Sequence, residues 1–365
     1  MNKKFAIATA ALIALAGLTG CGKKSPAITD CNAADNLRPI CQFHNPEDLE
    51  LLPDGKTLIV SQMGNFIEKK SGSLALFDTE TAQLTVVFPS ADIARSEELW
   101  GDATCPGLPG AEFTPHGISL TQRDDGRWQL AAINHGQRET VEMFEVVDNA
   151  GHYSLAWHGC AVPPAGIFMN DLALLRDGGF IASNMFDPRK PEIGGMSIEM
   201  YKGLLGMNTG YLFEWTPNKG TRVLAGSHSD LPNGVAIGAD ESTVFASSTG
   251  GNKVLKFERA TGKLLGSVAV PQPDNLSWDN HGQLLSVGYT GGGADQMDCA
   301  KHPGSNCSGG IEVVRIDPNT MQSSIVLQHI SPPLGTASIA QQVGEHLYLG
   351  SFSGDRLVVA PYAAP

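Results

Sequence analysis

Short apolar runs separated by polar turns fill most of this chain, and long runs with the period of a helix are scarce. The clearest example is LELLPDGKTLIVS at 49–61, in which a Pro-Asp-Gly turn joins two apolar runs. A run, a tight turn and a second run are the signature of a β-hairpin. The same pattern recurs at 118–134, 172–184, 235–248, 276–288 and 338–351. We therefore expect six hairpins, distributed along the whole chain.

Further strand candidates lie between the hairpins, at 73–81, 141–148, 210–217, 252–262 and 310–318. A hairpin with the strands that follow it makes a unit of about four strands, the size of one propeller blade. Six such units predict an all-β chain, a six-bladed β-propeller over residues 39–365. A β-helix suits the sequence less well because the hairpins are too widely and irregularly spaced. No boundary divides the chain into two β-sandwiches.

The N-terminal residues have the pattern of an export signal. Two lysines precede an apolar stretch, 5–18, that is too short to span a membrane comfortably. The stretch is followed by Gly20 and Cys21, which is the form of a bacterial lipoprotein signal; an ordinary secretory signal with a chance cysteine is the alternative. We expect residues 1–20 to be removed, Cys21 to carry lipid, and residues 21–38 to be the lipidated cysteine and its tether.

Charge and the residue after Cys21 limit the partners and the location. The formal net charge of the 365-residue chain is −13, whereas a nucleic-acid-binding protein needs a basic surface, so we expect no nucleic-acid partner. An acidic chain is compatible with cation binding. Gly22, rather than an aspartate, follows Cys21, which favours sorting to the outer membrane. We expect an exported lipoprotein that faces the periplasm and contacts the membrane through its lipid.

Six cysteines remain beside Cys21, and an oxidising compartment favours disulfides between them. Six cysteines allow 15 pairings. We favour two local pairs, Cys31–Cys41 and Cys299–Cys307, which leaves Cys105–Cys160 as the third. A zinc site is the alternative, but the chain has no Cys-x-x-Cys spacing to support it.

Polar residues suited to metal binding precede the hairpins. In a propeller the innermost strands converge on a central channel, so residues that lead into them should meet near the axis. Carboxylate and amide oxygens are the ligands that calcium prefers, whereas zinc favours histidine and thiolate. Asn-Asp and Asn-Gly pairs before strands are usually turn formers when taken singly. Five of the six positions supply oxygen ligands or a histidine, however, and this recurrence before successive hairpins favours a shared site. The pairs are Glu47-Asp48, His116-Gly117, Asn170-Asp171, Asn233-Gly234, Asp274-Asn275 and Thr336-Ala337.

Six motifs resemble, in order and context, those of the paraoxonase/arylesterase family. They are NPEDLELLPDG, FTPHGISL, INHGQRETVEMFEV, MNDLALL, LPNGVAI and PDNLSWD. The resemblance extends from about residue 43 to 358, and a looser one exists to the gluconolactonase and senescence-marker group. It implies a six-bladed propeller whose central tunnel holds two calcium ions.

The resemblance also implies roles for individual residues. The catalytic calcium would be held by Glu47, Asn170, Asn233, Asp274 and Asn275. The structural calcium would be held by Asp48, Asp171 and the main-chain carbonyl of Ile118. Neighbouring residues of a strand point to opposite sides, so the adjacent acids Glu47 and Asp48 would serve different ions. His116 and His135 would form a proton-transfer dyad, and Asp274 has an alternative role in deprotonating water or attacking directly.

The expected activity is calcium-dependent hydrolysis of lactones and carboxylic (aryl) esters. A sugar-lactone hydrolase of the gluconolactonase type would not need the two histidines, and a propeller that only binds a ligand or protein is a further alternative. Met63, Leu231 and Phe352 would line the substrate pocket. Residues 186–209 contain SIEMYKGLLG, which predicts a short amphipathic helix. The helix would act as a lid, or alternatively pack over the edge of a blade.

Two further expectations concern ring closure and the remaining histidines. The last predicted strand, 354–360, has no cysteine, although animal paraoxonases join the chain ends by a disulfide, so closure here should depend on main-chain pairing. His44, His158 and His281 lie in or beside turns without a matching motif, and we expect them to form surface or local contacts.

Overall fold

The computed structural model describes residues 27–64, 70–193, 196–291 and 306–363. The predicted signal sequence, Cys21 with the first part of the tether, and Cys299 lie outside these residues. Within them, no helix is long and apolar enough to cross a membrane.

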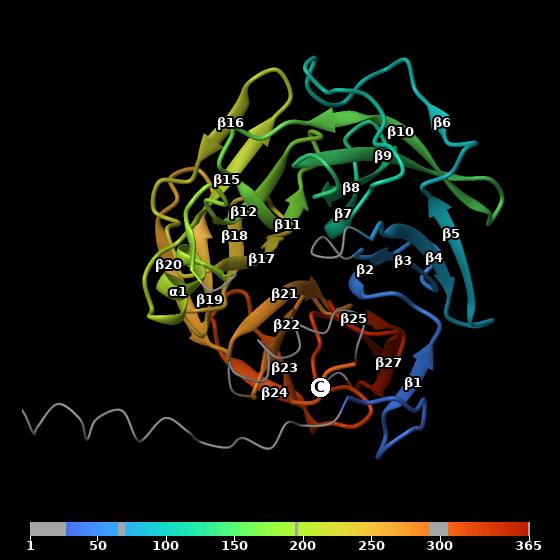
Figure 1. Ribbon diagram of the computed structural model, residues 1–365, viewed down its shortest axis with the longest axis vertical. Helices are drawn as coiled ribbons and strands as arrows, with labels where there is room; N and C mark the ends of the chain where they lie inside the picture. The colour runs from blue at the N-terminus through green and yellow to red at the C-terminus, as the bar shows by residue number, and fades with distance from the viewer. Residues whose placement is uncertain (1–26, 65–69, 194–195, 292–305, 364–365) are drawn as a thin grey trace, which may run out of the picture.

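Apart from one two-stranded ribbon, the described strands form six sheets around a common axis, each sheet being one blade of a propeller (Figure 1). Blade one comprises β2 (Pro46–Leu51), β3 (Thr57–Gln62), β4 (Ser73–Asp78) and β5 (Gln83–Phe88). Blade two comprises β7 (Pro115–Gln122), β8 (Trp128–Asn134), β9 (Thr140–Asp148) and β10 (Tyr153–Ala161), with the short β6 (Ala94–Arg95) beside β10. Blade three comprises β11 (Phe168–Leu174), β12 (Phe180–Phe186), β15 (Tyr211–Thr216) and β16 (Gly220–Val223).

The second half of the ring repeats the arrangement. Blade four comprises β17 (Pro232–Ile237), β18 (Thr243–Ser248), β19 (Lys253–Glu258) and β20 (Leu264–Ala269). Blade five comprises β21 (Pro273–Trp278), β22 (Leu284–Tyr289), β23 (Gly310–Ile316) and β24 (Ser323–Ile330). Blade six comprises β25 (Ile339–Val343), β26 (His346–Gly350), β27 (Arg356–Pro361) and β1 (Arg38–Cys41). The predicted all-β six-bladed propeller and its six hairpins are confirmed.

The innermost strands surround the axis. β2, β7, β11, β17, β21 and β25 each contact the next around the ring, and β25 contacts β2 to complete it. The apolar core lies between the blades, because the described buried residues form six clusters, each shared by two neighbouring blades. In β3, Leu58 and Val60 face blade six while Ile59 faces blade two. Both faces of a blade are therefore apolar, and the axis is left for polar side chains.

Main-chain pairing closes the ring, as predicted. β1 pairs antiparallel with β27, from Arg38 opposite Val359 to Cys41 opposite Arg356. Residues before β1 also lie against the propeller: Ile28 forms a β-bridge with Asn306 and is 8% exposed. The later part of the predicted tether therefore packs against the blades, because it carries its own apolar side chain and backbone partners.

The Cys31–Cys41 and Cys105–Cys160 disulfides are present. Cys307 is also disulfide-bonded, and Cys299, with which it is predicted to pair, lies outside the described residues. The predicted helix is α1 (Ile198–Leu204), whose first turn is capped by the Ser197 hydroxyl accepting the Glu199 N–H at 3.2 Å. A two-stranded ribbon, β13 (Glu192–Ile193) and β14 (Met196–Ser197), precedes it.

Candidate active site and metal centre

The first strands of five blades share one irregularity, and the predicted site residues lie at it. The register with the second strand shifts after Pro46, Pro115, Met169, Pro232 and Pro273. Such a β-bulge disrupts the ladder locally and re-aims side chains. The sequence places these residues before the strands, whereas they lie inside them, because each of these strands begins several residues earlier than predicted. β25 pairs without a shift.

At one of these bulges, the adjacent acids Glu47 and Asp48 contact different groups. Glu47 contacts Asn275 and His116, whereas Asp48 contacts the backbone of Leu49 and Ile118. The two acids therefore have different partners on either side of a β-bulge, and that they serve different ions stays a prediction. We call the five predicted ligands of the catalytic calcium the outer set: Glu47, Asn170, Asn233, Asp274 and Asn275. The inner set is Asp48, Asp171 and Ile118.

Hydrogen bonds join four members of the outer set in two pairs, Glu47 with Asn275 and Asn233 with Asp274. Asn275 donates from Nδ2 to Glu47 Oε1 at 2.8 Å, and His116 Nε2 lies 3.8 Å from the same oxygen. The Asn233 side chain donates to Asp274, which also accepts from the Tyr289 hydroxyl at 3.0 Å. These contacts connect four blades at one end of the channel.

Four oxygens of the outer set are buried without a hydrogen-bond partner among the described residues. They are Glu47 Oε2 and the Oδ1 atoms of Asn170, Asn233 and Asn275. Leaving one buried polar group unsatisfied costs about 1–3 kcal/mol, so four in one place call for an explanation. Carboxylate and amide oxygens are what calcium binds, and magnesium would retain more water. The donor set therefore fits calcium.

Histidine and cysteine ligands are not part of this donor set. Among the residues that the structure describes, no three His, Cys, Asp or Glu side chains gather as a metal site by themselves. The outer set is compatible with this absence, because it contains only two acids, Glu47 and Asp274, and its other three members are asparagines. Its composition matches a hard cation and does not match zinc.

Burial and neighbouring carboxylates disfavour the charged forms of the acids near the axis. Burial raises the pKa of Glu47 well above its ordinary value, and Asp48, Asp274 and Asp171 raise it further. Burial also raises the pKa of Asp48 to about 7 and that of Asp274 to about 7. A cation would favour the charged forms and oppose both effects.

Backbone N–H groups hold the inner set in place. Asp48 accepts from Leu49 N at 2.8 Å and from Ile118 N at 2.7 Å, so it joins blades one and two. Asp171 accepts from Leu172 N and Val235 N, both at 2.7 Å, so it joins blades three and four. Burial raises the pKa of Asp171 well above its ordinary value, and Asp48 adds to the shift.

Space at the axis is limited, which accounts for glycines in two of the predicted pairs. A Cβ on Gly117 would lie 2.5 Å from Asp171 Oδ1. A Cβ on Gly234 would lie 2.5 Å from the carbonyl oxygen of Asp274. Both positions therefore require glycine for neighbouring inner strands to approach each other this closely.

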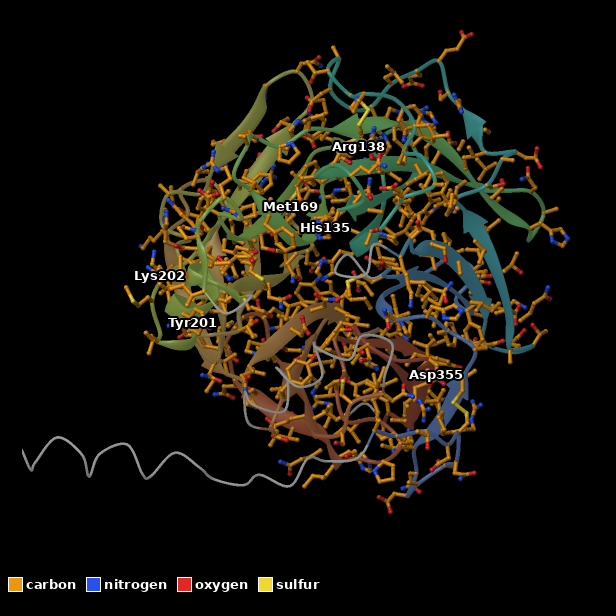
Figure 2. The ribbon with its side chains drawn as sticks, in the orientation of Figure 1. His135, Arg138, Met169, Tyr201, Lys202 and Asp355 are labelled. Carbon is orange, nitrogen blue, oxygen red and sulfur yellow. A yellow bond between two sulfur atoms is a disulfide. The ribbon has the colours of Figure 1, made fainter. Side chains whose placement is uncertain are left out.

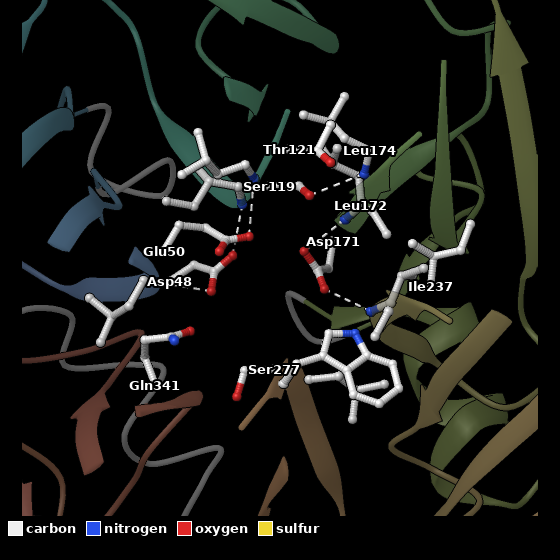
Figure 3. Close-up of a pocket in the computed structure, with 18 of the residues that line it drawn as sticks. Asp48, Glu50, Ser119, Thr121, Asp171, Leu172, Leu174, Ile237, Ser277 and Gln341 are labelled. Atoms are coloured by element: carbon white, nitrogen blue, oxygen red, sulfur yellow. Dashed lines mark hydrogen bonds between the residues drawn. The ribbon is translucent and has the colours of Figure 1, made fainter. Parts of the chain in front are cut away.

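A cavity of about 280 Å³ continues the channel on the side of the inner set (Figure 3). Asp48 and Asp171 reach into it together with Glu50, whose Oε1 accepts from Leu120 N at 3.1 Å. Burial raises the pKa of Glu50 to about 8, and the neighbouring Asp48 adds to the shift. None of the outer set lines this cavity, so the two sets face different parts of the channel.

The two predicted catalytic histidines are in contact. His116 Nδ1 lies 3.0 Å from His135 Nε2, and His116 Nε2 faces Glu47. Burial lowers the pKa of His116 well below its ordinary value, and the adjacent His135 lowers it further. A neutral His116 whose second nitrogen faces the outer set has the geometry of a general base.

Two residues at the site are missing from the sequence analysis. Glu139 Oε2 lies 2.7 Å from His135 Nδ1, and Tyr289 donates to Asp274. A carboxylate four residues after a histidine is a signal that could have indicated the first. The pairing of Pro273 with Gly288 brings Tyr289 beside the bulge, which only the register reveals.

The predicted pocket residues occupy different positions around the outer set. Phe352 lies with its ring centroid 6.3 Å from that of Tyr289, so it is near Asp274. Leu231 is buried, has a left-handed φ of 44°, and its side chain lies against Gly203 of α1. Met63 is buried directly after β3. That these residues contact substrate stays a prediction.

Two of the three remaining histidines, His44 and His281, are placed as expected. His44 is exposed at a bend, and its N–H donates to Gln62 Oε1 at 3.0 Å. The expectation is wrong for His158, which is buried within β10, where it stacks on Trp100 with ring centroids 3.9 Å apart and its Nδ1 lies 2.8 Å from the Glu98 carbonyl oxygen. His281 is exposed in a turn, where its N–H donates to Asp279. None of these contacts is with a member of the outer set.

Comparison with solved structures defines the class of fold. A gluconolactonase from Xanthomonas campestris matches with a TM-score of 0.50 and 21% identity, covering 90% of each chain. A luciferin-regenerating enzyme matches with a TM-score of 0.49 and 12% identity over 89% of this chain and 95% of its own. At such low identity, the first match supports the propeller fold alone. A search of curated proteins finds no match.

The family is defined by the sequence. A model of the arylesterase family matches residues 40–332, most of the chain. The chain therefore belongs to the arylesterase family, and the predicted resemblance is confirmed. Membership identifies it as a propeller hydrolase that acts on esters.

Proposed function

We propose that this protein is a calcium-dependent hydrolase of lactones and aryl esters, with two calcium ions in its central channel. The observation that carries the proposal is the group of four unpartnered oxygens in the outer set, with the His116–His135 pair beside it. Glu47, Asn170, Asn233, Asp274 and Asn275 would hold the catalytic ion. Asp48, Asp171 and the carbonyl of Ile118 would hold the structural ion.

Bound calcium would polarise the substrate carbonyl and stabilise negative charge that develops on its oxygen. His116 would accept a proton from water through Nε2 as the water oxygen bonds to the carbonyl carbon. His135 would share the positive charge through its contact with His116 Nδ1. When the bond from carbonyl carbon to the leaving oxygen breaks, the proton would pass from His116 to that oxygen. A lactone then gives one hydroxy acid, and an aryl ester gives a phenol and a carboxylic acid.

The test is a panel of aliphatic lactones, sugar lactones and aryl esters, each assayed in calcium and after metal removal. We expect turnover of aliphatic lactones or aryl esters that disappears without calcium and returns on its addition. Selective turnover of sugar lactones would favour the gluconolactonase-type alternative. Calcium binding without hydrolysis of any substrate would favour a propeller that only binds a ligand or a protein.

We also propose that the protein is exported and anchored through lipid on Cys21, facing the periplasm at the outer membrane. The sequence from Lys3 to Gly22 supports this proposal. Metabolic labelling with a fatty-acid analogue should mark the parent and leave Cys21→Ser unmarked. Equal labelling of the two proteins would contradict it.

A further inference from the structure

One carboxylate connects the histidine pair to the strand that carries a predicted calcium ligand. Glu139 directly precedes β9 in blade two, and its Oε2 lies 2.7 Å from His135 Nδ1. Its other oxygen, Oε1, accepts from the backbone N–H of Met169 in blade three at 2.6 Å. Met169 precedes Asn170 of the outer set. Figure 2 shows His135 and Met169 close to the centre of the ring.

The surroundings of His135 restrict its ring. The side chain is 3% exposed, whereas that of Glu139 is 22% exposed. Phe168 stacks on the imidazole with centroids 4.6 Å apart and an interplanar angle of 8°. The stack fixes the plane of the ring and Glu139 fixes one of its edges, so the opposite edge is aimed at His116.

The hydrogen-bond chain has only one consistent arrangement when both histidines are neutral. A carboxylate can only accept, so His135 Nδ1 must carry the hydrogen, and its Nε2 then carries a lone pair. His116 Nδ1 must in turn donate to His135 Nε2. The lone pair of His116 is then on Nε2, the nitrogen that faces Glu47 and the outer set.

We propose that Glu139 is a positioning residue of the hydrolytic site, which sets the tautomers of both histidines so that His116 presents an unprotonated Nε2 to the substrate water. The inference rests on the proposed function for its effect on turnover, and on geometry alone for its effect on the tautomers. As His116 takes up a proton at Nε2, its Nδ1 hydrogen can shift to His135 Nε2, where the resulting imidazolium is paired with Glu139.

Glu139→Gln is the sharpest test because it preserves shape and reverses the hydrogen-bond polarity. The glutamine oxygen can still accept from Met169, while its amide group donates to His135 Nδ1. Both tautomers then reverse, and His116 Nε2 carries a hydrogen. We expect kcat to fall by about 100-fold or more with KM nearly unchanged, since a misdirected base loses most of its effect. Glu139→Asp, which retains the charge, should recover part of the loss.

Glu145→Gln is the matched control. Glu145 forms the same kind of pair, with its Oε2 3.1 Å from His158 Nε2, in the same blade but away from the outer set. It should leave kcat and KM unchanged. Calcium titration and thermal unfolding of all variants would show whether Glu139→Gln acts by loss of metal or of the fold.

Nitrogen NMR of the imidazoles, at alkaline pH where neutral rings predominate, tests the inference without turnover. We expect the hydrogen of His135 on Nδ1 in the parent and on Nε2 in Glu139→Gln, with the signal assigned from His135→Gln. An unchanged tautomer, or an unchanged kcat despite a reversed tautomer, would overturn the inference. A parent that hydrolyses nothing would refute the proposed function, while the tautomers would still decide the structural part.

Discussion

The amide of Asn275 donates to Glu47 Oε1 across 228 positions of sequence and joins blade five to blade one at the axis. This bond leaves Glu47 Oε2 and Asn275 Oδ1 unpartnered within the described chain, although both are buried. The pair is therefore oriented by one hydrogen bond so that two further oxygens remain available. A site prepared in this way needs the charge of Glu47 as well as its shape.

Glu47→Gln should consequently impair catalysis more than folding. Glutamine can still accept from Asn275, but it removes the negative charge that would attract the catalytic calcium. We expect turnover to fall by about two orders of magnitude or more, a loss of the size seen when one electrostatic contact is removed from an active site. Calorimetric calcium titration should show weaker calcium binding. Without metal, the unfolding temperature of the variant should equal or exceed that of the parent protein. Parental turnover in this variant would contradict the ligand assignment.

Asp48→Asn should reduce stability first. Both oxygens of Asp48 accept backbone N–H groups, from Leu49 and Ile118, and an asparagine offers one oxygen and one donor. One buried N–H would lose its acceptor and meet another donor, at a cost of about 1–3 kcal/mol. Urea unfolding in excess calcium would measure the loss. The exposed Asp92→Asn is the control, and equal stability of the two variants would argue against the structural role of Asp48.

The fold could be predicted from sequence because each blade begins with a local pattern. The turn at Pro53-Asp54-Gly55 and its counterparts indicate hairpins without knowledge of the tertiary structure. The strand beginnings were harder, since Pro46, Pro115, Pro232 and Pro273 resemble loop residues. Each is nevertheless the first residue of its strand, a position where proline is tolerated.

The site could be predicted in part for a related reason. The outer-set residues are recognisable as oxygen ligands that recur at equivalent places in successive hairpins. The bulges that aim them depend on pairing with a second strand, and sequence alone does not specify that pairing. The spacing of Glu139 from His135 is a local signal for their contact. The contact of Glu139 with Met169 joins two blades, and no local pattern in the sequence indicates it.

His116→Gln should abolish most hydrolysis without unfolding the protein. Glutamine has no group that can take up a proton near neutral pH, so we expect turnover to fall by about 10²–10⁴-fold. The side chain lies at the edge of the outer set and its ring is 11% exposed, so a smaller polar residue can be accommodated. The exposed His281→Gln is the control for turnover and unfolding temperature. Unchanged turnover in His116→Gln would refute the assignment of the dyad.

Metal removal should reverse the pH dependence of stability. In the metal-free chain, the pKa of Asp48 and that of Asp274 are raised from 3.8 to about 7, so between these values the folded state binds more protons than the unfolded state. The free energy of unfolding of the metal-free protein should therefore fall as pH rises through this window.

With calcium in excess the sign should be opposite, because the ion binds ionised carboxylates and protons compete with it. Metal should be removed by dialysis, because the affinity of a chelator itself varies with pH. The unfolding temperature should then be measured at several pH values between about 4 and 7, with and without added calcium. We expect the difference in unfolding temperature between the two conditions to grow as pH rises. Surface acids contribute equally to both curves and cancel in the difference. Parallel curves would show that no carboxylate of the channel exchanges protons for calcium, and would refute both ion sites.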